Sequence, residues 1–136
     1  MSIPDAAFAP MERFNSNVRG LMQIAETIDG ANPTVGRVRN LVSIGTDLHP
    51  FEAIKLAGPY ITKYAEQIKN KDANFFLTGG IAAEIATANE MVAEVFGLVS
   101  TRWPQLSADQ QAKIWLKVEN MRAAAERFAP FAARVQ

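Results

Sequence analysis

The chain has 136 residues, a formal net charge of zero, no cysteine and an apolar fraction of 49%. This length suits one domain with a real core, and the absence of cysteine excludes disulfides and thiolate metal sites. Zero net charge provides no global field that would attract nucleic acid or an anionic membrane, and it weakens repulsion between copies of the chain.

The N-terminal residues lack a basic region followed by an apolar run, so we expect no signal peptide. No stretch of about 18 uninterrupted apolar residues occurs, which excludes a membrane span. We therefore expect a soluble protein of the cytoplasm or another intracellular compartment, folded as a single helical domain over residues 1–136.

Apolar residues recur at helical spacing along most of the chain. Residues 1–10 are expected to form an extended lead, because Pro4 and Pro10 interrupt regular structure. A first helix is predicted from about Met11 to Asp29.

A cap residue followed by proline, Asn32-Pro33, predicts the start of a second helix, and Gly45 is expected to end it. A third helix is predicted to open at His49-Pro50. Gly58-Pro59 should kink or split that third helix.

The second half of the chain begins with a short helical turn predicted over residues 73–78. One long helix is then predicted from about Ile81 to Arg102. The spacing of Ser107 and Gln110 predicts a capping box at the start of a last helix, and residues 130–136 are expected to be a tail. Together these elements predict an all-α bundle of about five mostly antiparallel helices with short loops.

The last predicted helix carries apolar residues on two faces. Ile114, Val118 and Met121 share one stripe, whereas Trp115 and Leu116 lie off it. A helix with two apolar faces is either central in its domain or pressed against a partner. The second possibility predicts an interface, since Trp and Phe are enriched at the centres of protein interfaces. The interface candidates are Trp103, Trp115, Leu116, Phe75, Phe76 and Phe131. The competing interpretation is that a layered bundle buries them all.

A second hypothesis is nucleic-acid binding, because cationic side chains can contact phosphates. The candidate residues are Arg13, Arg19, Arg37 and Arg39. The segment from Val35 to Leu56 also has a helix–turn–helix order, but the second helix offers few side chains that read bases. We therefore favour a protein partner over nucleic acid.

A third hypothesis is a small helical enzyme that uses His49, the only histidine, with Asp47 or Glu52 as its orienting carboxylate. A capping role at the turn is the competing interpretation of His49. One imidazole supplies too few ligands for a metal site, and we expect no cofactor. The acidic residues Glu90 and Glu94, one turn apart, are interpreted as a solvated helix face.

Two segments, residues 68–77 (IKNKDANFFL) and residues 114–118 (IWLKV), resemble segments of small all-helical proteins of large double-stranded DNA viruses. The resemblance implies a virion or assembly component and carries no functional residues. The leading hypothesis from the sequence is a non-catalytic interaction or assembly module that associates with itself or with another protein.

Overall fold

The computed structural model describes residues 3–77 and 80–135, and their side chains except those of Phe76, Leu77 and Gly80. Across these residues all regular structure is helical. The longer helices are α1 (Phe8–Asp29), α2 (Pro33–Leu48), α3 (Glu52–Lys63), α7 (Glu90–Arg102) and α8 (Ala108–Phe128). The shorter ones are α4 (Ala65–Lys69), α5 (Asn74–Leu77) and α6 (Gly80–Ile85), with 3₁₀ turns η1 (Asp5–Ala7), η2 (Trp103–Gln105) and η3 (Ala129–Arg134). The predicted all-α bundle is confirmed.

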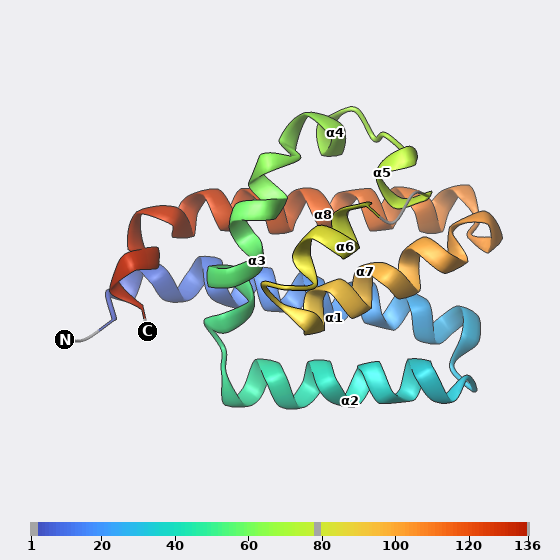
Figure 1. Cartoon of the computed structure of the whole chain (residues 1–136), viewed down its shortest axis with the longest axis horizontal. Coiled ribbons are helices and arrows are strands. Elements are labelled where there is room, and N and C mark those ends of the chain that lie inside the picture. The colour runs from blue at the N-terminus through green and yellow to red at the C-terminus, as the bar shows by residue number, and fades with distance from the viewer. Residues whose placement is uncertain (1–2, 78–79, 136) are drawn as a thin grey trace.

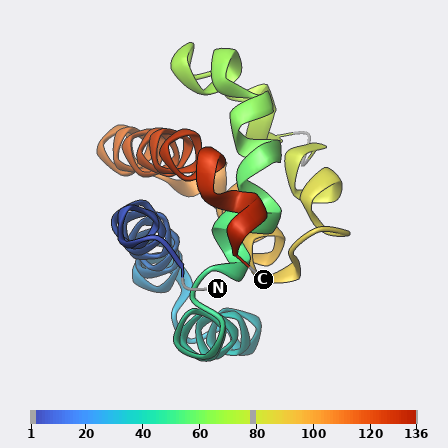
Figure 2. The same cartoon turned by 90° about the vertical axis from the view of Figure 1, so that its left-hand side faces the viewer.

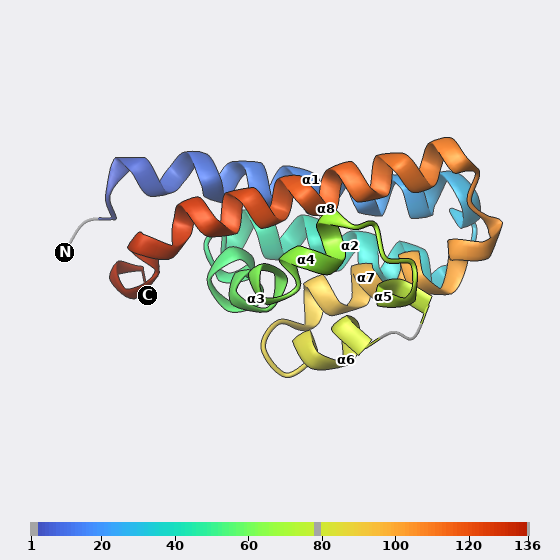
Figure 3. The ribbon, with the colours of Figure 1, turned by 90° about the horizontal axis from the view of Figure 1, so that it is seen from above.

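Four of the long helices, α1, α2, α7 and α8, lie along the long axis of the molecule, and α3 crosses them (Figure 1). α1 runs antiparallel to α2 and to α8, as short connections favour. Seen from the end, α2 lies at the edge of the bundle, whereas α3 passes through its middle (Figure 2). From above, α1 and α8 lie side by side along one edge, with α6 at the opposite edge (Figure 3).

The core is one cluster of apolar side chains that extends from Ala7 to Val135. α8 supplies much of it, because it packs against α1, α3 and α4. The largest fully buried side chains of the core include Phe14, Phe96, Phe128, Leu21, Ile54, Ile61, Ile85, Ile114 and Met121. In the part of the chain that the structure describes, no helix is both long and apolar enough to cross a bilayer.

Two predicted helix starts are confirmed at the level of single hydrogen bonds. The Ser107 side chain accepts from the backbone N–H of Gln110 at 3.1 Å, and the Gln110 side chain accepts from the N–H of Ser107 at 2.9 Å. The Asn32 side chain accepts from the N–H of Thr34 at 2.9 Å, with Pro33 at the first helical position. Both caps satisfy N–H groups that have no partner within the helix.

The predicted extended lead and tail are corrected by the structure. Asp5–Ala7 form a 3₁₀ turn, and α1 begins at Phe8, so that Pro10 lies in its first turn. Proline is tolerated there because the first helical N–H groups have no acceptor in any case. At the other end, η3 follows α8, and Val135 is 1% exposed. Ala7, in the 3₁₀ turn, and Val135 are therefore both part of the core.

The predicted end of α2 at Gly45 is wrong, and α3 is not split at Gly58-Pro59. α2 continues past Gly45 to Leu48, and the N–H of His49 donates to the carbonyl of Gly45. α3 begins at Glu52, continues through Pro59 and ends at Lys63. The helix ends before Tyr64 instead, where the backbone N–H donates to the carbonyl of Ile61, three residues earlier, before α4 begins.

The helix predicted over residues 81–102 is in fact two helices, α6 and α7. Asn89 separates them, and its side chain caps α7 by accepting from the N–H of Val92 at 2.9 Å. The short turn predicted over residues 73–78 corresponds to α5, and Thr78 lies outside the described residues. The break at Asn89 turns α6 back beside α7, which creates the groove described below.

Candidate functional site

Most of the aromatic side chains predicted to form an interface lie in the core. Trp103 and Trp115 are 6% and 7% exposed, and their rings meet edge to face with centroids 5.7 Å apart. Phe75 is 8% exposed, and its ring packs against that of Tyr64 with centroids 5.3 Å apart. The premise that these three residues are exposed is wrong, because α4 packs against α8 and η2 brings Trp103 back onto it. α8 is thus a central helix with two covered faces.

Leu116 is the one α8 candidate with an open side chain, at 61% exposure. It lies at a shallow groove with Lys69, Lys71 and Glu119. Phe131 is half-buried against the core, and the side chain of Phe76 lies outside the described residues. Leu116 by itself is too small a surface to define an interface.

The four candidate arginines do not share one partner. Arg13 donates to Asn120 on α8 at 3.2 Å, whereas Arg37 forms an ion pair with Glu94 on α7 at 3.1 Å. Arg19 and Arg39 are exposed, and neither forms an ion pair within the described part of the chain. One of the four charges is therefore already compensated inside the protein. Nucleic-acid binding stays a prediction without further support.

His49 is exposed at the turn between α2 and α3 and lines an open groove of about 380 Å³. Lys55 and Val135 line the same groove, and the Lys55 ammonium donates to the carbonyl of Val135. Asp47 and Glu52 form no ion pair with His49 among the described residues. The described part of the chain also contains no group of acidic and histidine side chains able to hold a metal ion. The catalytic hypothesis for His49 stays a prediction, with no oriented base to support it.

Exposed apolar side chains gather instead at the α2–α3 turn. Leu48 and Leu56, 68% and 38% exposed, line the groove beside His49. Ile44, 59% exposed, precedes Leu48 by one helical turn, and Phe8, 41% exposed, packs edge to face on Phe51 at 5.1 Å. We call Phe8, Ile44, Leu48 and Leu56 the α2–α3 patch. It contains all but one of the large apolar side chains that are exposed in the described residues.

The sequence prediction ended α2 at Gly45 and so left Leu48 of this patch outside the helix. With the helix continued to Leu48, Ile44 and Leu48 lie one turn apart on the outer face, beside Leu41, which is half-buried against the core. Val35, Val38 and Val42 occupy the inward face and are buried. α2 therefore has a second apolar stripe on a helix at the edge of the bundle. The helical spacing of Ile44 and Leu48 is present in the sequence, but it becomes apparent only when the helix extends beyond Gly45.

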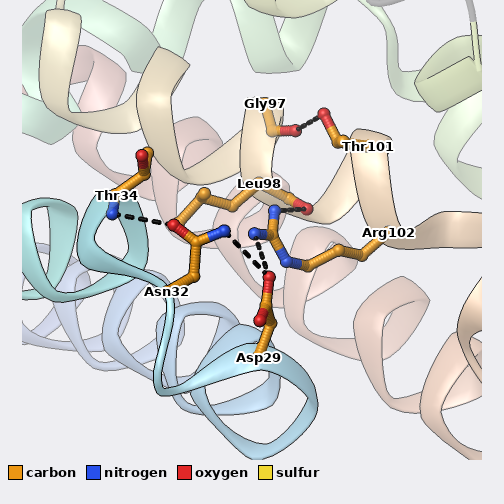
Figure 4. A network of polar contacts seen from close by, with 7 residues as sticks. All are labelled: Asp29, Asn32, Thr34, Gly97, Leu98, Thr101 and Arg102. Atoms are coloured by element: carbon orange, nitrogen blue, oxygen red, sulfur yellow. Dashed lines mark hydrogen bonds and ion pairs between the residues drawn. The ribbon is translucent and has the colours of Figure 1, made fainter.

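A groove of about 780 Å³ lies between α6, α7 and the start of α2, and is here called the α6–α7 groove. At one end of it lies a network of polar contacts (Figure 4). The Asp29 carboxylate accepts from Arg102 at 2.8 Å and from the Asn32 amide at 3.1 Å. Arg102 also donates to the carbonyl of Leu98 at 3.3 Å. The network ties the end of α1 to the end of α7.

Hydrogen bonding determines the electrostatics of this network. The hydrogen bond from Arg102, with a smaller contribution from Asn32, holds the pKa of the Asp29 carboxyl below its ordinary value. The Nε of Arg102 is buried and has no hydrogen-bond partner among the described residues. One donor in this end of the groove is thus unsatisfied.

No protein family, curated protein or solved structure matches this chain. The resemblance to viral assembly proteins gains no support from these comparisons and stays a prediction.

Proposed function

We propose that the protein is a non-catalytic interaction module that pairs with a second copy of itself through the α2–α3 patch. The observation that carries the proposal is the exposure of Ile44 and Leu48, 59% and 68%, one turn apart on the outer face of α2. Large apolar side chains grouped on a surface are typical of sites that a partner covers.

The outer face of α2 has the spacing of a helix-pairing seam. Leu41, Ile44 and Leu48 follow steps of three and four, with Leu41 half-buried against the core and Ile44 and Leu48 exposed. α2 lies at the edge of the bundle (Figure 2), so a second helix can pack along Ile44 and Leu48. A pair formed around a twofold axis would set the same face of α2 from each copy against the other.

The charges around the patch suit such a pair. The acidic side chains Asp47 and Glu52 lie beside it together with the basic Lys55. In a twofold pair, a rim with both signs can place acids of one copy near a base of the other. The formal net charge of zero adds no long-range repulsion between copies.

The strength expected of the pair is modest. Burying a Leu or Ile side chain completely is worth about 1.5–3 kcal/mol, and these side chains are already partly covered, so each contributes roughly 1 kcal/mol. The side chains of both copies together must offset an association cost of about 4–15 kcal/mol. We therefore expect a reversible pair whose population rises with protein concentration.

Sedimentation velocity and light scattering across a wide range of protein concentration test this proposal. The wild-type mass should rise from one chain to two, and the double variant Ile44→Ser, Leu48→Ser should remain a single chain. The matched control is Leu116→Ser, which removes an equally exposed leucine elsewhere on the surface. A wild type that stays monomeric, or a pair abolished only by Leu116→Ser, would contradict the proposal.

A further inference from the structure

The α6–α7 groove is a second surface, at the opposite end of α2 from Leu48. Its floor is one face of α7, where Ala93, Gly97 and Thr101 follow each other at steps of four. Its far wall is formed by the small side chains of Ala82 and Ala86. A Cβ atom added at Gly97 would meet no atom within 4 Å, so the space above the floor is open.

The groove has the length of a short helix. It follows α7 from Glu90 to Arg102, and with a rise of about 1.5 Å per residue this is roughly 18 Å, or about three helical turns. Small residues at steps of four along the floor allow a second backbone to approach closely. An occupant with small side chains on its own contact face would fit best.

The charges in the groove are uneven. Glu94 is compensated by Arg37 at 3.1 Å, and Arg102 is compensated by Asp29 at 2.8 Å. Glu90 is exposed and has no cationic partner in the part of the chain that the structure describes. The uncompensated charge is therefore negative and lies at one end of the groove.

From these observations we propose that the α6–α7 groove binds an amphipathic α-helix of a partner protein. The contact face of this helix carries small apolar residues and places a Lys or Arg opposite Glu90. Such a helix-in-groove contact uses apolar burial for affinity and the charge pair for orientation. The site is separate from the α2–α3 patch and does not depend on pairing.

The probe is a phage-displayed library of short helical peptides, selected on the full chain, followed by fluorescence anisotropy with the enriched peptides. We expect these peptides to carry Lys or Arg at one end and small residues on one face. Binding should weaken by about tenfold or more when Gly97→Leu fills the floor. Glu90→Gln should weaken binding severalfold and reduce its dependence on salt.

Two controls keep the result interpretable. Ala86→Leu blocks the groove from the opposite wall at an exposed position, so it should reduce binding even if Gly97→Leu disturbs α7. The double variant Ile44→Ser, Leu48→Ser should bind the peptides as wild type does, because it alters only the α2–α3 patch. The proposal is overturned if no peptide is enriched, if both blocked variants bind as well as wild type, or if the enriched peptides are acidic.

Discussion

Trp103 and Trp115 lie edge to face in the core, with ring centroids 5.7 Å apart, although the chain turns between them from α7 into α8. Their contact fixes the turn, since η2 brings one indole back onto the second turn of α8. Edge-to-face aromatic pairs add about 0.5–1.5 kcal/mol to what the buried area contributes. The pair is therefore a structural element of the bundle, and the surface for partners lies elsewhere.

This placement predicts that substitutions at the neighbouring residues Trp115 and Leu116 lower the free energy of unfolding by very different amounts. Trp115→Ala should lower the free energy of unfolding by about 3–5 kcal/mol, because it leaves a cavity in the core. Leu116→Ala, at a side chain that is 61% exposed, should change it by less than about 0.5 kcal/mol. Urea denaturation followed by circular dichroism measures both. Equal costs at the two positions would contradict the assignment of Trp115 to the core.

Gly97→Ala should stabilise the protein by about 0.5–1 kcal/mol, because glycine is a poor helix former and the added methyl group has open space. The matched control is Gly58→Ala in α3, where the new Cβ would lie 3.2 Å from the Cβ of Ala125. That crowding should cancel or reverse the gain. Thermal unfolding of both variants tests the difference, and a destabilised Gly97→Ala would show that the groove floor is more crowded than the structure indicates.

Ser107→Ala removes the hydroxyl that caps α8 and should cost about 1 kcal/mol of stability. Ser43→Ala, at an exposed serine inside α2, should cost little and serves as the control. Chemical denaturation of both variants provides the comparison. If the two losses are alike, the capping box at the start of α8 contributes nothing measurable.

The Asp29 carboxylate should make stability depend on pH. Its pKa is lowered in the folded state, chiefly by the hydrogen bond from Arg102, so its contribution is present above the unfolded pKa of about 3.9 and is lost as the pH falls through the folded pKa. Asp29→Asn should therefore be less stable than wild type at neutral pH, and the difference should shrink in acid. Urea denaturation at pH values on both sides of 4 measures it.

Glu119, whose pKa is lowered mainly by its hydrogen bonds from Arg122, remains in both proteins and so cancels from this comparison. A difference between wild type and Asp29→Asn that stays constant down to strongly acidic pH would show that the carboxylate charge is not what stabilises the network.

Local signals explain what could be predicted from the sequence. The cap of α8 depends on Ser107 and Gln110, three residues apart, and the start of α2 depends on Asn32 and its immediate successors. Interactions of this range are complete within one helical turn, so the residue types are sufficient to predict them. The same holds for the buried stripe of α8 that contains Ile114 and Val118.

The sequence by itself therefore determined the helical class of the fold and several of its helix starts. Only the tertiary structure decided which apolar faces are covered. Trp115 is buried and Leu116 is exposed although they are neighbours, because burial depends on what distant segments bring to each side of the helix. The contact of Asp29 with Arg102, 73 residues away, and the groove beside it arise in the same way. Such contacts form between surfaces, and no short stretch of sequence contains both.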